Sequence, residues 1–142
     1  MIRYKSQVSL SRPPADVFPY LVEQAKQALW SNVPMRPLTP GALRQGSRAE
    51  LTFGKGPLKV TLGLELTAVE QDARIAFKSF SGPIDWQGEY LLAAADGGST
   101  LSQTGTLTFH GLWRLLEPLI GAEMKGGEIK ELERLKAVLA VS

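Results

Sequence analysis

The chain has 142 residues, 44% of them hydrophobic, and its 16 basic and 14 acidic side chains leave a formal net charge of +2. This length predicts one domain, residues 1–142, with a hydrophobic core large enough to be stable without disulfides or a structural metal. The absence of cysteine excludes a disulfide framework, and the small net charge argues against nucleic acid as a partner.

The sequence shows no membrane-spanning or targeting pattern. No run approaches the ~18 consecutive apolar residues that a transmembrane helix requires. Residues 1–5 alternate in polarity, whereas a signal peptide starts with a charged stub and an apolar run. We therefore expect a cytoplasmic protein with no transmembrane segment.

The first part of the chain predicts a strand followed by two short helices. Polar and apolar side chains alternate over residues 2–10, as in a half-buried strand. A Pro-Pro pair suits the first turn of a helix, where the backbone N–H has no helical acceptor. We predict helices over residues 13–21 and 23–30, with Pro19 causing a kink or break near their junction. Their inward side chains would be Val17, Phe18, Leu21, Ala25, Leu29 and Trp30.

The middle of the chain predicts six more strands, over residues 33–38, 47–53, 58–68, 74–80, 84–92 and 100–109. The first of these contains two prolines, which cannot donate to a sheet ladder, so we expect it at a sheet edge. Alternation is clearest in the third, whose inward side would hold Leu58, Val60, Leu62, Leu64, Leu66 and Ala68. Each antiparallel turn reverses the chain, which predicts loops at two rims: 31–32, 54–57, 81–83 and 110–111 at one, and 39–46, 70–73 and 94–98 at the other.

The last 32 residues, 111–142, predict one long amphipathic helix. Apolar residues recur there at steps of three and four, with charged residues between them. The only surface large enough to bury this face is a sheet that curls around it, so we predict an α+β helix-grip fold. Gly126 and Gly127 should weaken or bend the helix, since each interior glycine costs ~1 kcal/mol relative to alanine. The apolar face would be Leu112, Leu116, Leu119, Ile120, Met124, Ile129, Leu132, Leu135 and Leu139.

Several short motifs resemble the START/Bet v 1-like (SRPBCC) superfamily, most closely its polyketide cyclase/dehydrase-like branch. They are spread over nearly the whole chain: residues 11–18 after the first strand, Trp30, the 41–48 turn, Gly82-Pro83, residues 97–101 and residues 132–139. The resemblance implies a seven-stranded curved antiparallel sheet wrapped on the long helix, with an apolar cavity that opens at the 54–57, 81–83 and 110–111 rim. Members bind lipids, sterols, polyketides or hormones, and some catalyse cyclisation or dehydration. Because the superfamily shares no catalytic motif, the resemblance implies no catalytic residue; the Gly126-Gly127 pair departs from its usually continuous final helix.

The residue inventory argues against metal and nucleotide chemistry. His110 is the only histidine and cysteine is absent, so we predict no metal site and no cofactor. Residues 41–48 have the glycine spacing of a phosphate-binding loop, but they lack its lysine and precede a strand instead of a helix. Asp85 and Glu89 share the outer parity of their strand, which is typical of a solvated surface.

The charged residues are unevenly distributed along the chain. Residues 1–60 hold nine basic and three acidic side chains, and the remainder holds seven and eleven. This excess belongs either to a solvated surface or to a patch that attracts an anionic group. Its basic members are Arg36, Arg44, Arg48, Lys55 and Lys59.

Strand parity predicts a ligand-binding set. We expect Phe77, Trp86, Tyr90 and Gln103 to face the long helix, and Leu116, Ile120 and Met124 to face them in return. The inward polar groups of Ser6, Ser79, Gln103 and Tyr90 would either form structural hydrogen bonds or orient a ligand. His110, between the last strand and the long helix, would either fill that joint and cap a backbone group or serve as a proton donor at the cavity mouth.

Three functions are compatible with this set. The leading hypothesis is binding or transport of a small hydrophobic molecule, such as a lipid or polyketide, in the internal cavity. The alternative is a cyclase or dehydratase in which His110, Tyr90 or Gln103 polarises a carbonyl group. A third is an interaction module that presents the final helix to a partner.

Overall fold

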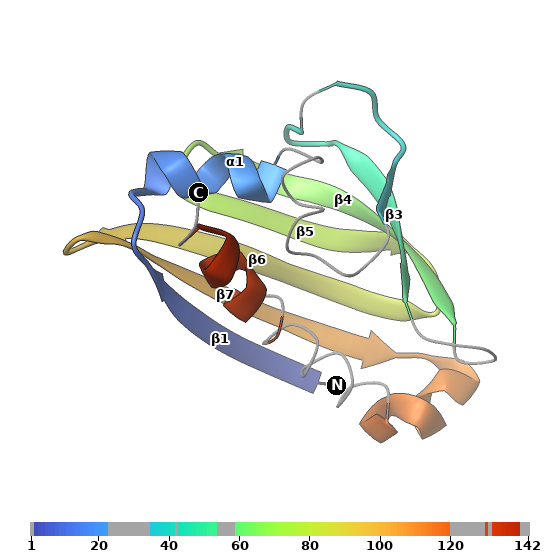
Figure 1. Cartoon of the computed structure of the whole chain (residues 1–142). Coiled ribbons are helices and arrows are strands. Elements are labelled where there is room, and N and C mark those ends of the chain that lie inside the picture. Colours follow the sequence, from blue (N-terminus) through green and yellow to red (C-terminus); the bar gives the residue numbers. More distant parts are fainter. Residues whose placement is uncertain are drawn as a thin grey trace.

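The computed structural model describes residues 2–22, 35–41, 43–53, 59–119, 130 and 132–139. Within them, seven strands form one antiparallel sheet in the order β1-β7-β6-β5-β4-β3-β2, and helices lie against one of its faces (Figure 1). The predicted seven-stranded sheet is therefore confirmed, with β2 at one edge. The strands are β1 (Ile2–Leu10), β2 (Met35–Pro37), β3 (Arg48–Phe53), β4 (Val60–Glu70), β5 (Arg74–Ser81), β6 (Ile84–Ala95) and β7 (Gly98–Phe109).

The longest pairings lie at the β1 side of the sheet. β6 and β7 form a hairpin in which Ala95 pairs with Gly98 across a two-residue turn, and Gly97 has the positive φ of 77° that glycine adopts without strain. β1 then pairs with β7 along its whole length, from Ile2 to Leu10. The first and last strands of the sequence are thus neighbours, which brings residues about a hundred positions apart onto one surface.

Because β4 contains a β-bulge, the predicted assignment of its side chains to the two faces is wrong beyond Leu66. Leu66 pairs with Phe77 and Ala68 with Ala76, so Thr67 is an extra residue on β4. The extra residue reverses the faces beyond it. Ala68, which we expected to point inward, joins the outer face, and Val69 packs against the core in its place.

The first helix, α1 (Pro14–Val22), includes Pro19, as does the predicted helix over 13–21. The expected kink or break near the junction with the second helix falls where this described segment ends. Proline removes one helical hydrogen bond, but Phe18 and Leu21 on either side of it are buried against the sheet, as predicted, and this burial favours a continuous helix. The second predicted helix, 23–30, lies outside the described residues.

The described parts of the C-terminal region are helical, but the first turns differ from the prediction. Gly111–Leu116 forms a 3₁₀ helix (η2), residues 117–119 are α-helical, and the chain is again helical over 132–139. Leu112 and Leu119, expected on the buried face, are 82% and 60% exposed. A 3₁₀ helix has three residues per turn, so Leu112 aligns with the equally exposed Leu115 while Leu116 points toward the protein. Gly126 and Gly127 lie outside the described residues.

The buried apolar side chains of the described residues fall into two clusters. The first joins α1 and residues 132–139 to one end of the sheet; its members are Val8, Leu10, Val17, Phe18, Leu21, Ile75, Leu92, Leu101, Leu132, Leu135 and Leu139. The second lies toward the other end, next to η2; its members are Val60, Leu62, Leu64, Ile84, Trp86, Leu107 and Phe109. Among the described residues, no helix has the length and hydropathy needed to span a lipid bilayer.

Replacing Leu135 tests whether the C-terminal helix holds the sheet in this shape. Leu135 is fully buried in the first cluster, so Leu135→Ala should lower the free energy of unfolding by about 2–5 kcal/mol. Leu91, on the outer face of β6, is 41% exposed, and Leu91→Ala should cost only about 0.5 kcal/mol. Urea unfolding measures both; equal losses for the two variants would contradict the packing of this helix on the sheet.

Candidate functional site

The face of the sheet that contacts α1 and residues 132–139 is called the inner face, and the opposite one the outer face. On the four strands β1, β5, β6 and β7, the buried aliphatic side chains of the inner face all belong to one of the two core clusters. Between the clusters runs a band of glycine, polar and aromatic residues. This middle band consists of Tyr4, Ser6, Phe77, Gly88, Tyr90, Gln103 and Gly105.

Two glycines make room for aromatic rings in the middle band. Gly88 of β6 pairs with Gly105 of β7, and the next residues in that row are Phe77 of β5 and Tyr4 of β1. A Cβ on Gly105 would clash with the Tyr4 ring and hydroxyl, and one on Gly88 would lie 3.0 Å from Cζ of Phe77. The two rings therefore occupy the space above the glycines.

Trp86 fixes both rings from the adjacent position on β6. Its indole Nε1 donates a hydrogen bond of 2.8 Å to the Tyr4 hydroxyl. Its ring meets Phe77 edge to face, with centroids 5.1 Å apart and planes at 85°, a favoured aromatic geometry. The structure thus brings the predicted site residues Phe77 and Trp86 together and adds Tyr4, which the predicted ligand-binding set does not include.

A row of polar side chains crosses the same band. Ser6 pairs with Gln103, and Gln103 pairs with Tyr90. Gln103 is buried, with 3% of its surface exposed, and Tyr90 is partly buried. The Ser6 hydroxyl is buried and has no hydrogen-bond partner among the described residues, an arrangement that costs about 1–3 kcal/mol unless another group bonds to it. Ser79, by contrast, has a structural role: its hydroxyl accepts a 3.0 Å bond from the Trp86 backbone N–H.

The remaining predicted ligand-binding residues come from the C-terminal region. Leu116, the last residue of η2, is partly buried and packs against the second cluster. Ile120 and Met124 lie outside the described residues. Four of the seven predicted residues therefore share the inner face, and a fifth borders it.

His110 lies at the predicted joint, but its side chain points to the other side of the sheet. Its Nε2 is 2.7 Å from an Asp85 carboxylate oxygen, and both side chains are more than half exposed. Asp85 has the outer parity, as predicted, so the pair lies away from the middle band. At the start of η2 the His110 side chain makes no capping bond; its backbone N–H instead donates to Pro83 O at 3.3 Å, which joins the two loops of one rim.

Several other titratable groups of the described residues form exposed ion pairs. Three arginines of the basic N-terminal half are paired with acids: Arg12 with Asp16 at 3.7 Å, Arg36 with Glu50, and Arg48 with Glu65 at 2.9 Å. Lys55 lies outside the described residues. Within the described part of the chain, no group of three histidine, cysteine, aspartate or glutamate side chains could hold a metal ion.

Comparison with known proteins gives matches to structures alone. No family model and no curated protein sequence matches the chain. TTHA0849 from Thermus thermophilus is 18% identical, with a TM-score of 0.80 over 99% of both chains. Ara h 8.0201 is 14% identical, with a TM-score of 0.71 over 99% of both chains. DynU16, of the dynemicin biosynthetic locus, is 19% identical, with a TM-score of 0.71 over 97% of this chain and 47% of its own.

The bond between Tyr4 and Trp86 can be tested by removing one oxygen atom. Tyr4→Phe keeps the ring over the glycines but leaves the largely buried indole N–H without this acceptor, so we expect a loss of about 1–3 kcal/mol in the free energy of unfolding. In a Trp86→Phe background the same change should cost at least about 1 kcal/mol less. Urea unfolding of the four proteins gives this coupling; a value near zero would contradict the bond.

Proposed function

Since the protein has the START/Bet v 1-like (SRPBCC) fold, we propose that it binds a small hydrophobic molecule, such as a lipid or polyketide, on the inner face of its sheet. The middle band is the binding wall, and the side of the C-terminal helix that faces it is the opposite wall. The predicted residues Phe77, Trp86, Tyr90, Gln103 and Leu116 contact the ligand from the described part of the chain; Ile120 and Met124 complete the set.

The composition of the middle band carries this proposal. A sheet that only packs on a helix has aliphatic side chains along the whole inner face, because close packing fills the core with them. Here the aliphatic residues gather at two ends, while the centre holds paired glycines and partly buried rings of Tyr4, Phe77 and Tyr90. Apolar walls with a few polar groups are typical of small-molecule sites.

The polar row sets the ligand's chemistry. Ser6, Gln103 and Tyr90 supply hydrogen-bonding groups to one place on an otherwise apolar wall. A ligand with one carbonyl or hydroxyl group can bond there to the Ser6 hydroxyl, for which the described residues supply no partner. The match to DynU16, a protein of the dynemicin biosynthetic locus, supports the inclusion of aromatic polyketides among the candidates.

The enzymatic alternative requires a proton donor on the inner face. His110 bonds to Asp85 on the outer side, so it is poorly placed to act on a ligand held by the middle band. The other two candidates, Tyr90 and Gln103, do lie in the middle band, and product analysis tests whether they polarise a carbonyl group. We therefore propose a carrier or sensor, and we include product analysis in its test.

The binding proposal predicts saturable binding of a neutral apolar probe. N-phenyl-1-naphthylamine should bind the native protein, change its own emission and quench tryptophan emission through proximity to Trp86. Phe77→Leu removes an aromatic face from the wall and should weaken this binding roughly fivefold, since an aromatic contact contributes about 1 kcal/mol. Phe80→Leu is the matched control, because Phe80 lies on the same strand but is 40% exposed and packs on Arg48; it should leave binding unchanged.

Competition then identifies the ligand class. A panel of fatty acids, sterols and aromatic polyketides should displace the probe, with product analysis of each mixture for wild type and His110→Ala. Displacement without turnover supports a carrier. Turnover that His110→Ala abolishes would replace the carrier with an enzyme, and absence of any binding would refute both.

A further inference from the structure

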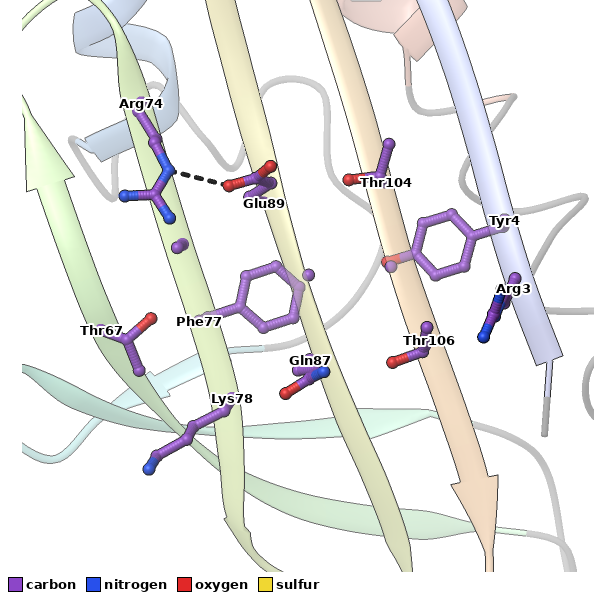
Figure 2. A pocket seen from close by; sticks show the side chains of 13 residues that line it. Arg3, Tyr4, Thr67, Arg74, Phe77, Lys78, Gln87, Glu89, Thr104 and Thr106 are labelled. Carbon is purple, nitrogen blue, oxygen red and sulfur yellow. Dashed lines mark hydrogen bonds and ion pairs between the residues drawn. The ribbon is translucent and has the colours of Figure 1, made fainter.

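The outer face has a groove of its own, of about 470 Å³, over β1, β7, β6 and β5 (Figure 2). Its volume is within the range of small-molecule sites. The groove and the middle band lie on opposite faces of the same part of the sheet. Tyr4, Phe77, Gly88 and Gly105 of the middle band also border the groove, although their positions in the strands direct their side chains to the inner face.

Short side chains at the centre and long ones around them create the hollow. Ala76, whose side chain is a single methyl group, leaves the floor low, and the bulge in β4 adds the small side chain of Thr67 at one edge. Thr104 and Thr106 of β7 form the opposite side. The longer side chains around the floor belong to Arg3, Arg74, Lys78, Gln87 and Glu89.

One of the three cations around the groove is neutralised by the protein itself. Arg74 bonds to Glu89 and to Glu70, each at 2.8 Å (Figure 2 shows the first bond). The hydrogen bond with Glu89, followed by that with Glu70, raises the pKa of Arg74 above its ordinary value, so this guanidinium stays charged and occupied. With two carboxylates on one guanidinium, the network carries one net negative charge, so the anion must bind away from it.

The other two cations are available. Within the described part of the chain, Arg3 and Lys78 take part in no ion pair. They belong to one row of outward residues across four strands, Arg3, Thr106, Gln87 and Lys78. Three strand spacings separate the ends of this row, about 14 Å, and two side chains with hydroxyl and amide groups lie between the charges.

We propose that the outer groove binds a hydroxylated organic anion about the size of a monosaccharide phosphate or sugar acid. Its phosphate or carboxylate binds to Arg3 beside Thr106, because charge-assisted bonds to guanidinium are the strongest available there. Its hydroxyl groups bond to Thr104, Thr106 and Gln87. Lys78 lies beyond Gln87 in Figure 2, and its exposed side chain turns toward the anion by rotamer changes alone.

This site differs from the proposed inner site in place and chemistry. The inner wall is apolar with a few neutral polar groups, whereas the groove presents three threonine hydroxyls, one amide and the two available cations. A neutral apolar ligand has few contacts to gain in the groove, and a charged sugar would lose its hydration on the inner wall.

The test is a titration of the ¹⁵N-labelled full chain with glucose 6-phosphate, glucuronate, inorganic phosphate and glucose, followed by amide NMR shifts. Glucose 6-phosphate or glucuronate should shift amides at 87–89 and 104–106 in a saturable way. Combined Arg3→Gln and Lys78→Gln should weaken binding roughly tenfold, and Thr106→Val severalfold. Lys59→Gln, an exposed charge outside the groove, is the control and should change nothing.

Each titration in this experiment has a result that would overturn the proposal. Equal binding of glucose and glucose 6-phosphate would refute the anion site, and phosphate binding as tight as glucose 6-phosphate would refute the role of the hydroxyl groups. Shifts elsewhere, or none, would refute the groove. Binding of the neutral apolar probe should be the same in the Arg3→Gln, Lys78→Gln double variant as in wild type, so that failure here is distinct from failure of the inner site.

Discussion

The pairing of β1 with β7 is the constraint on which both faces of the sheet depend. Its register sets Tyr4 opposite Gly105, and this one alignment directs Tyr4 and Ser6 inward and Arg3 outward. A shift by one residue would exchange the faces. The Tyr4 hydroxyl would then lose the Trp86 indole, the Ser6 hydroxyl would leave the Gln103 side chain, and Arg3 would leave the groove. The side chains of β1 therefore contribute to both faces of the sheet next to β7, which lies about a hundred residues later in the sequence.

The pair of glycines beneath Tyr4 and Phe77 has a different role on each face. On the inner face, the missing side chains admit two aromatic rings near the centre of the sheet, where aliphatic packing would otherwise be expected. On the outer face, the same two residues only border the groove, between Arg74, Glu89 and the threonines of β7, because a side chain at either position would point inward. Replacing either glycine by a larger residue would displace the Tyr4 or Phe77 ring. Such substitutions should therefore disturb the inner wall more than the outer groove.

Sequence patterns predicted the sheet well because alternation is a local signal. They failed where the deciding contact is non-local or the spacing is ambiguous. The bulge at Thr67 is invisible because Leu66 and Ala68 continue the apolar alternation, and only pairing with β5 shows the extra residue. The step of four from Leu112 to Leu116 fits an α-helix, but in the 3₁₀ helix Leu112 shares its side with Leu115 instead, so Leu112 was placed on the wrong side. The role of Tyr4 depends on a partner 82 positions away, although the Asp96-Gly97 turn would have paired Gly88 with Gly105 by counting back along the hairpin.

The central claim is that the middle band is a wall of a ligand site and not a filled core. Native mass spectrometry of the freshly purified protein, followed by a crystal structure of the same sample, tests it most directly. If the middle band is a binding wall, the protein carries a bound apolar molecule, with electron density over Phe77 and Tyr90 and a polar atom near the Ser6 hydroxyl. A protein of bare mass whose crystal structure shows C-terminal side chains packed against Phe77 and Tyr90, with a protein partner on Ser6, would contradict it.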